Sequence, residues 1–287
     1  MKDSLQSTLR RLRLSGLAQT LDVRLQEAAS HQLSHAEFLE LILQDELLVR
    51  EDRQVQRRVK AACFRELKPL DEFEWSFNPS LPKKDIFDLA TCRFIRERRD
   101  VLLIGPPGTG KSFIAQAVGF HAIKQGFTVL YRSIFDMVRD FLHDEVLGDD
   151  DKVLAGYLKP DLVIIDDMGM KQLPRRSGEV LFEVVMRRYE MRSTMMTSNR
   201  PLEDWGKLIG DVPSAAAILD RFLHHVDILT FNGKSYRLRR QPSISSTPEN
   251  APNAAIAPTG SDSTDAVPSH QTTRKNRKPN PRTACQS

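Results

Sequence analysis

Cysteine is scarce in this chain of 287 residues, and its three copies are far apart. Cys63, Cys92 and Cys285 are odd in number and form no C-x-x-C pair. This pattern favours neither a disulfide framework nor a cysteine zinc site. We therefore expect a protein of a reducing compartment, the cytoplasm.

Long apolar runs are also missing from the sequence. A membrane-spanning helix needs roughly 18 consecutive apolar residues, and no run approaches that length. The opening residues, MKDSLQSTLRRLRLSG, are charged and lack the apolar centre of a signal peptide. We expect no association with a membrane.

A strong excess of one charge sign is absent as well. The formal net charge is +4 at pH 7, and the sequence pI is about 9.0. This mild basic excess is compatible with a nucleic-acid partner and equally with an ordinary soluble surface. Charge alone therefore leaves the class of partner open.

The end of the chain lacks large apolar side chains. From Gln241 onward there is no Leu, Phe, Tyr, Trp or Met. Such a segment cannot bury enough apolar area to offset its ordering entropy, so we predict a disordered tail over 241–287. A basic cluster in it is compatible with a solubilising role or with weak electrostatic attraction to nucleic acid. The cluster comprises Arg274, Lys275, Arg277, Lys278 and Arg282.

Helical patterns fill the first part of the chain, residues 1–68, which we predict to be an N-terminal helical domain. Leucines recur there at near-helical spacing, and Gly16 is expected to break or bend the first helical stretch. Ser34 and Glu37 have the S-x-x-E spacing of a capping box directly before an apolar face. A second helix is therefore expected to begin there and to run into a strongly basic stretch.

The segment 69–85 is rich in proline and aromatic residues and is predicted to be a connector. Its aromatic side chains Phe73, Trp75 and Phe77 are expected to pack on a core rather than near a nucleotide base.

From 86 to 240 helical patterns alternate with short apolar runs. Strands are predicted at 101–104, 127–132, 161–167 and 193–199, and helices at 86–98, 111–125, 133–158 and 177–191. Buried strands alternating with helices indicate an α/β fold, a three-layer arrangement with a parallel sheet covered on both faces.

A phosphate-binding motif follows the first predicted strand. Residues 105–112 read GPPGTGKS and match G-x-x-x-x-G-K-[ST] between a strand and a helix, the context that this motif requires. Its glycines let successive backbone N–H groups face phosphate oxygens, and the helix N-terminus adds positive potential. We expect Lys111 to contact the β- and γ-phosphates and Ser112 to ligate Mg²⁺. The predicted nucleotide contacts are Gly105, Pro106, Pro107, Gly108, Thr109, Gly110, Lys111, Ser112 and Phe113.

Two carboxylates end the third predicted strand, in the stretch LVIIDDMG. In a parallel sheet the carboxyl end of such a strand lies beside the phosphate loop. Asp166 is expected to hold Mg²⁺, and Asp167 to orient or deprotonate the attacking water. A pair of acids at a strand end is also compatible with an ordinary loop start.

The fourth predicted strand ends in Asn199, before Pro201. This residue is expected between the phosphate loop and the two acids, where its amide could hold the attacking water; the alternative is a simple turn residue. The sequence has no N-K-x-D stretch for guanine recognition, so ATP is expected rather than GTP.

An arginine often offsets the charge that phosphoryl transfer places on the γ-phosphate, in cis or from a neighbouring subunit. Arg221, in the predicted short helix AAAILDRFLHH, is a candidate. A plain surface arginine is the alternative.

These motifs and their flanks resemble AAA+ ATPases of the DnaC/IstB branch, and most closely the IstB family of transposition helper ATPases. The ATPase motifs are shared by many P-loop proteins, so the flanking segments carry the specific part of the likeness. They are LRLSGLAQTL, LSHAEFLELILQDEL, RRVKAACFRELKPLDEF and the stretch from Asn199 to about residue 240.

The resemblance implies Walker A at Lys111 and Ser112, Walker B at Asp166 and Asp167, sensor 1 at Asn199, and an arginine finger at Arg221. It also implies an ATP-dependent homo-oligomer on duplex DNA that selects or deforms target DNA and stimulates an IstA-like transposase.

The sequence departs from the AAA+ pattern in two places. Many AAA+ proteins have Asp-Glu at Walker B, whereas Asp167 is shorter, so hydrolysis is expected to be slow or to need a stimulator. Little chain follows Arg221 for a helical lid, and Arg237 is a candidate for sensor 2.

Contacts with DNA are expected to be phosphate-directed and without sequence specificity. The candidates are Arg132 and Arg139 of RSIFDMVRDF, and Arg53 and Arg57 of the basic stretch 50–58. Two alternatives to a transposition helper stay open: a DnaC-type helicase loader, and a nucleotide-gated DNA-binding scaffold with little turnover.

Overall fold

The computed structural model describes residues 2–147, 150–169, 177–209 and 212–240. The predicted disordered tail, its basic cluster and Cys285 lie outside these ranges. Among the described helices, none combines the length and apolarity that crossing a membrane demands.

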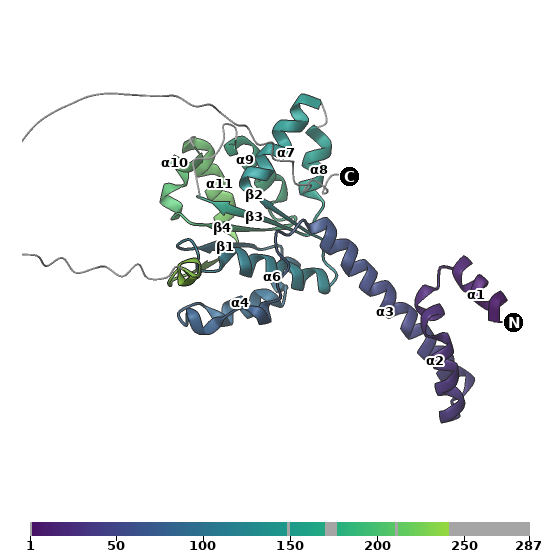
Figure 1. The fold of residues 1–287 in the computed structure, drawn as a ribbon. Coiled ribbons are helices and arrows are strands. Elements are labelled where there is room, and N and C mark those ends of the chain that lie inside the picture. The colour runs from purple at the N-terminus through teal and green to yellow at the C-terminus, as the bar shows by residue number, and fades with distance from the viewer. Residues whose placement is uncertain (1, 148–149, 170–176, 210–211, 241–287) are drawn as a thin grey trace, which may run out of the picture. The chain divides into compact units, whose positions relative to one another are not determined.

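A five-stranded parallel sheet forms the centre of the part of the chain that follows the connector (Figure 1). Its order is β2-β3-β4-β1-β5. The strands are β1 Asp100–Ile104, β2 Val129–Ser133, β3 Leu162–Met168, β4 Ser193–Ser198 and β5 Val226–Thr230. The four predicted strands and the parallel α/β class are confirmed. Strand β5 was missed because it lies at the edge, where its residues are only partly buried and form no apolar run.

Successive residues of each strand enter two separate cores. Val101 and Leu103 of β1 pack in one core, while Leu102 between them packs in the other. Side chains alternate across a strand, so a sheet buried on both faces needs apolar residues at every position. This explains the unbroken apolar runs in the sequence.

Helices cover both faces of the sheet (Figure 1). One face carries α4 (Lys83–Ala90) and α6 (Lys111–Lys124), together with α5 (Arg93–Arg96). The other carries α7 (Ile134–Leu147), α8 (Asp150–Leu158), α9 (Ser177–Arg188), α10 (Trp205–Ile209) and α11 (Val212–His224). Short 3₁₀ turns lie at η1 Leu70–Glu72, η2 Trp75–Phe77, η3 Leu202–Asp204 and η4 Tyr236–Arg240.

Two predicted helices are each divided in the structure. The prediction of one helix over 86–98 was wrong, because Cys92 adopts a left-handed conformation with φ 58° between α4 and α5. The predicted helix 133–158 is α7 followed by α8.

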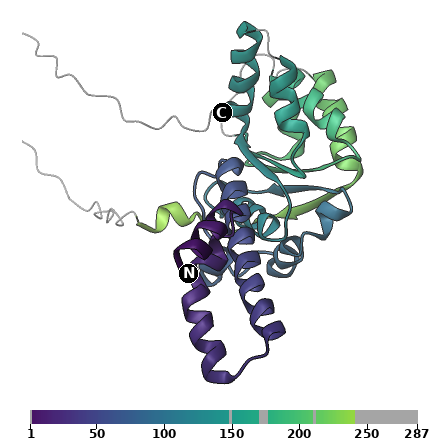
Figure 2. The ribbon, with the colours of Figure 1, turned by 90° about the vertical axis from the view of Figure 1, so that its right-hand side faces the viewer.

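The N-terminal part contains α1 (Lys2–Arg11), α2 (Ser15–His31) and α3 (His35–Ala62), with α2 and α3 side by side (Figure 2). The predicted capping box is confirmed. The Ser34 hydroxyl accepts from the Glu37 N–H at 3.3 Å, and the Glu37 carboxylate accepts from the Ser34 N–H at 2.8 Å. This reciprocal pair marks the start of α3.

The prediction that Gly16 breaks a helix was wrong. The chain turns earlier, where Arg13 has φ 57°, and Gly16 lies buried in the first turn of α2. A Cβ there would come within 2.9 Å of Asp45, Glu46 and Val49 on α3. Glycine is required at this position because the two helices approach closely, not because the helix ends.

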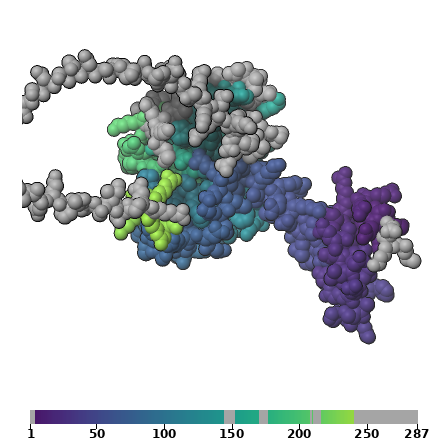
Figure 3. Space-filling model, in the orientation of Figure 1, coloured from purple at the N-terminus to yellow at the C-terminus, as the bar shows by residue number. Residues whose placement is uncertain are grey.

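Helix α3 contributes to two cores. Its Ile42 packs with Leu17 and Leu21 of α2, and the purple α1 and α2 lie against this part of α3 in the space-filling view (Figure 3). Its last turns place Val59 and Ala62 in the core beside α6. The division of the chain at residue 68 stays a prediction.

Candidate nucleotide-binding site

The carboxyl ends of β1, β3 and β4 meet at one edge of the sheet. The phosphate loop joins β1 to α6, and its Gly105 N–H donates to the Ser198 carbonyl at the end of β4 at 3.1 Å. The Asn199 N–H donates to the Met168 carbonyl at the end of β3 at 2.9 Å. Because β4 lies between β1 and β3, Asn199 is located between the loop and the two acids, as the sequence predicts.

The loop has the curled backbone that its glycines permit. Gly108 and Gly110 have φ values of 81° and 101°, in the left-handed region that favours glycine. A Cβ on Gly110 would lie 2.7 Å from the ring of Phe73, so the loop also needs glycine for space. Helix α6 follows the loop directly. The N–H groups of its first turn point toward the loop end of the helix, where an anion is favoured.

Lys111 is buried and reaches back across the loop. Its ammonium donates to the carbonyls of Gly105 and Pro106, both at 2.7 Å. Burial lowers the pKa of Lys111 to about 8; Asp166 opposes this shift, and Arg237 adds to it. A partly desolvated ammonium held at the loop is suited to binding phosphate oxygens.

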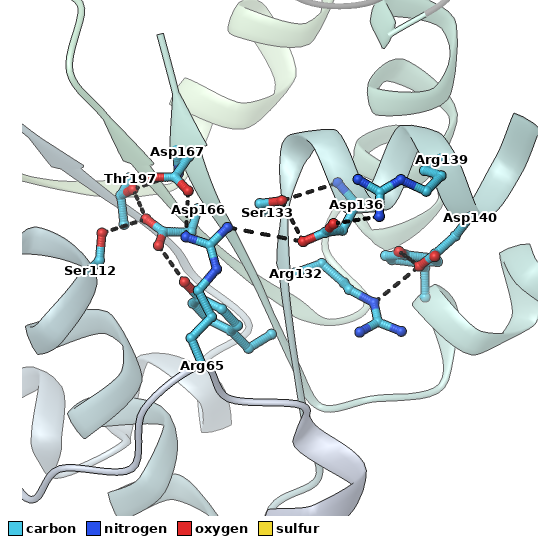
Figure 4. A network of polar contacts seen from close by, with 12 residues as sticks. Arg65, Ser112, Arg132, Ser133, Asp136, Arg139, Asp140, Asp166, Asp167 and Thr197 are labelled. Carbon is cyan, nitrogen blue, oxygen red and sulfur yellow. Dashed lines mark hydrogen bonds and ion pairs between the residues drawn. The ribbon is translucent and has the colours of Figure 1, made fainter. Parts of the chain in front are cut away.

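Asp166 is fully buried and accepts from three hydroxyl groups (Figure 4). Ser112 Oγ donates to its Oδ1 at 2.9 Å, Thr197 donates to the same oxygen, and Tyr131 donates to Oδ2. Burial, with Asp166 adding to its effect, raises the pKa of Tyr131, so the phenol stays protonated and donates. Three neutral donors from three elements hold this carboxylate in one orientation.

Ser112 and Asp166 fit a Mg²⁺ ion. Both present oxygen atoms, the ligand type that this hard cation prefers. Their oxygens are 2.9 Å apart. Neighbouring ligands of an octahedral Mg²⁺ with bonds of about 2.1 Å are separated by about 2.9 Å, from simple geometry. The residues present therefore match the predicted metal site.

Asp167 has a different environment, although it is the next residue. It is half-buried, and its carboxylate accepts from Arg65 Nη1 at 2.6 Å (Figure 4). Burial lowers the pKa of Arg65, but the hydrogen bond to Asp167 and the charges of Tyr131, Asp167 and Asp166 together outweigh burial and raise this pKa. Asp167 has φ 66°, and the β3–β4 register shifts between Ile165 and Met168. Bulges of this kind re-aim side chains next to active sites.

A cleft of about 460 Å³ lies over the loop. This volume is within the range of small-molecule sites, about 300–1,000 Å³. The cleft is lined by the loop residues Gly108 to Phe113 and by Asp167. Further lining residues come from elsewhere in the chain: Arg65, Phe73, Phe77, Asn78, Gln116, Tyr131, Tyr236 and Arg237.

The connector aromatics do not all pack as predicted. Trp75 stacks on Phe87 with ring centroids 5.5 Å apart, which agrees with core packing. Phe73 also packs against this core, as predicted, and in addition lines the cleft. The prediction was wrong for Phe77, which lines the cleft and contacts the Tyr236 ring. Phe73 also lies 5.3 Å from the Phe113 ring, because η1 and η2 fold over the loop.

The segment after β5 forms another wall of the cleft. Asn78 exchanges two 3.0 Å hydrogen bonds with the backbone of Lys234, and Tyr236 N–H donates to the Gly108 carbonyl at 2.9 Å. Glu74 pairs with Arg239 at 2.6 Å. These contacts bring Arg237 to the cleft, where the sequence made it a candidate.

Comparison with known proteins shows to which family the chain belongs. The family model described as "IstB-like ATP binding protein" matches residues 7–243. The chain belongs to this family. The ATP-binding protein of insertion sequence IS5376 from Geobacillus stearothermophilus is 34% identical over 241 residues, which cover 84% of this chain and 96% of that relative. The corresponding protein of IS21 from Pseudomonas aeruginosa is 33% identical over 237 residues, covering 83% of this chain and 89% of that relative.

Solved structures support the AAA+ fold. The replication initiator DnaA bound to AMPPCP and single-stranded DNA matches with a TM-score of 0.50 and 19% identity. The match covers 60% of this chain and 52% of DnaA. At this identity the likeness concerns the fold alone.

Within this IstB-like chain, the predicted arginines that remain do not line the cleft. Arg221, on α11, is exposed, and its guanidinium lies 5.5 Å from the centre of the Tyr189 ring. Arg139 is 74% exposed, and Arg53 and Arg57 are exposed on α3. Arg132 is half-buried and pairs with Asp140 at 3.0 Å, an arrangement that favours a structural role.

Several site residues were missed by the sequence analysis. Thr197 and Tyr131 stand near the carboxyl ends of apolar strands, and their polar groups were a usable signal there. Arg65 carried no local signal, because it reaches Asp167 from a segment 102 positions away. Only the folding of that segment over β2 and β3 brings the two together.

Proposed function

We propose that this protein is an ATP-hydrolysing transposition helper, which oligomerises on duplex DNA and stimulates a partner transposase. The observation that carries this proposal is the convergence of Lys111, Ser112, Asp166 and Asp167 at one cleft in an IstB-like chain. The names of its relatives, which refer to ATP binding and insertion sequences, support the same function.

Each site residue has a separate role in this proposal. Lys111 and the loop N–H groups bind the β- and γ-phosphates, and Ser112 and Asp166 hold Mg²⁺. When bound, Mg²⁺ neutralises charge on the phosphate oxygens. Asp167 orients the attacking water or accepts its proton, and Asn199 helps to hold that water.

Arg221 is proposed to act on the ATP of a neighbouring subunit. Its exposure on α11 is compatible with contact in trans, and the guanidinium would offset charge on the γ-phosphate. Mixing inactive Lys111→Ala subunits with Arg221→Ala subunits tests this role. Partial recovery of turnover in the mixture supports a shared site, whereas no recovery contradicts it.

Contacts with DNA are proposed for Arg139, Arg53 and Arg57, because these side chains are exposed. Replacing a phosphate-contacting arginine lowers the salt slope of binding by about one unit. Fluorescence anisotropy with duplex DNA at several salt concentrations measures this slope for each alanine variant.

The direct test is ATP hydrolysis with and without duplex DNA. We expect turnover that DNA stimulates and that Lys111→Ala abolishes together with nucleotide binding. Capture of an IstA-like transposase, and not of a replicative helicase, supports transposition; the reverse result favours a helicase loader.

A nucleotide-gated scaffold with little turnover is the second candidate. The pairing of Asp167 with Arg65 favours it, because the guanidinium occupies an oxygen of the carboxylate that would contact the attacking water. Tight nucleotide-dependent DNA binding without DNA-stimulated hydrolysis would support this candidate.

A further inference from the structure

Four side chains of alternating charge connect the surface of α7 with the nucleotide cleft (Figure 4). Arg139 lies 3.3 Å from Asp136, Asp136 lies 4.0 Å from Arg65, and Arg65 lies 2.6 Å from Asp167. We name this set the charge relay. Its outer end, Arg139, is a proposed DNA contact, and its inner end, Asp167, is the proposed water-orienting carboxylate.

Arg65 is placed where it can contact either acid. Its backbone is anchored, because the next residue, Glu66, donates its N–H to Gln116 Oε1 at 3.0 Å. Gln116 in turn donates to the Ser112 carbonyl at 3.1 Å, which ties this segment to α6. The Arg65 side chain itself is half exposed and lies 5.8 Å from the Tyr131 ring centre. A fixed backbone with a long, accessible side chain permits exchange between two acceptors.

The present pairing restrains Asp167. The guanidinium donates to Oδ2 of Asp167, a residue that lines the cleft. A carboxylate that is neutralised by an arginine at hydrogen-bond distance is a weaker acceptor for water. Asp167 therefore needs to lose this partner before it can orient the attacking water.

Asp136 is the alternative acceptor for Arg65. It accepts from the Ser133 hydroxyl at 2.7 Å and is paired with Arg139. Arg139 is 74% exposed, so a DNA phosphate can compete for it. When Arg139 leaves, the negative charge of Asp136 is less compensated and attracts Arg65 more strongly.

We propose that Arg65 is a positioning residue that restrains Asp167, and that DNA binding at Arg139 transfers Arg65 to Asp136 and so releases Asp167 for hydrolysis. This inference rests on the proposed function, since it concerns how DNA regulates the same site. It assigns the stimulation by DNA to one chain of contacts within a single subunit.

The test compares ATP hydrolysis by the full chain with and without duplex DNA. For Arg65→Ala we expect basal kcat to rise about twofold to fivefold, the range for loss of one partly exposed ion pair. KM should stay within about twofold, and DNA should add little further turnover, because removing a partner of Asp167 changes the chemical step and not uniform binding. Arg65→Lys keeps the charge and should restore part of the restraint.

Asp136→Asn tests the second acceptor. It should reduce stimulation by DNA about threefold or more without raising basal turnover, because Arg65 loses its alternative partner. The double variant Arg65→Ala/Asp136→Asn should behave like Arg65→Ala. Arg187→Ala, which breaks an exposed pair with Glu183 far along the chain, is the matched control and should resemble wild type.

Basal turnover of Arg65→Ala at or below that of wild type overturns the relay, as does normal stimulation of Asp136→Asn by DNA. Wild-type turnover that Lys111→Ala abolishes upholds the proposed function whichever way the Arg65 variants behave. Absence of turnover from both wild type and Arg65→Ala overturns the function and the relay together.

Discussion

Asp166 and Asp167 are consecutive residues with opposite surroundings. Asp166 is fully buried and held by three neutral hydroxyl groups from β2, β4 and α6. Asp167 is half-buried, has a left-handed backbone, and is paired with a charged side chain that is itself half exposed. Neutral donors in a dry core fix one geometry, whereas an accessible ion pair can be exchanged. The comparison distinguishes a fixed acid, the proposed Mg²⁺ ligand Asp166, from an acid with an exchangeable partner, the proposed water-orienting residue Asp167.

Replacing Asp166 and Asp167 each by asparagine should give the largest difference in turnover and in Mg²⁺ requirement between the two acids. Asp166→Asn removes the negative charge of the proposed metal ligand. It also places an amide NH₂ group, which is a donor, next to hydroxyl groups that donate. We expect turnover to fall on the order of a hundredfold or more, with a raised Mg²⁺ requirement. Asp167→Asn should cost only about tenfold, below the usual range for a general base because Arg65 already restrains this carboxylate, with an unchanged Mg²⁺ requirement. Hydrolysis rates over a Mg²⁺ titration measure both, and identical profiles would remove the distinction.

Tyr131→Phe should weaken the proposed Mg²⁺ binding at Asp166 and leave Asp167 unaffected. It deletes one of the hydroxyl groups that orient Asp166, and such supporting contacts are worth about tenfold in metal affinity. The Mg²⁺ concentration for half-maximal hydrolysis measures the change. Tyr157→Phe removes the same group from Asp140, a contact between helices α8 and α7, and serves as the control. An equal shift in both variants would mean that the effect is not local to Asp166.

Asp167→Glu should have a smaller effect on turnover, because it changes only the reach of the proposed water-orienting carboxylate. The longer side chain extends the carboxylate by one carbon–carbon bond, so we expect kcat to rise about twofold to fivefold. The φ of 66° is less favourable for glutamate than for aspartate, so the melting temperature should fall slightly. Unchanged or lower kcat in a folded variant would show that reach does not limit hydrolysis.

Asp100→Asn should have the smallest effect on turnover, because this acid lies at the start of β1, away from the cleft. Burial raises the pKa of Asp100 to about 7, while the Thr194 N–H at 2.6 Å opposes the shift. The folded chain thus binds more protons than the unfolded chain between about pH 4 and 7. The stability from this group is fully present below that range and is lost as pH rises through about 7.

The asparagine variant should therefore gain about 1–3 kcal/mol over wild type at pH 8, with a flatter dependence of unfolding free energy on pH. Urea unfolding at pH 5 and pH 8 measures this difference. If the unfolding free energies of the two proteins depended equally on pH, burial of the Asp100 carboxylate would not destabilise the fold at high pH.

Local features account for the successful predictions. The Ser34–Glu37 box acts within one helical turn, and the apolar runs before Gly105 and Asp166 alternate between two buried faces. The phosphate loop is also a contiguous motif, so its residues could be assigned without knowledge of distant segments. These are interactions of short range along the chain.

The failures concern contacts between distant segments. Gly16 looked like a helix breaker, but its role depends on the close approach of α3, whose atoms would lie 2.9 Å from a Cβ at this position. Phe77 looked like a core residue because nothing local shows that the connector folds over the loop. Strand β5 has no apolar run, since an edge strand has one neighbouring strand and needs less apolar surface.

The sequence by itself determined the parallel α/β class, the phosphate loop and the two acids, because each depends on periodicity or spacing within about ten residues. Only the tertiary structure decided which acid is fixed and which is restrained. That decision depends on Tyr131, Thr197 and Arg65, which reach Asp166 and Asp167 from 35, 31 and 102 positions away. No local pattern encodes such encounters, since they arise only when the sheet and its covering segments have formed.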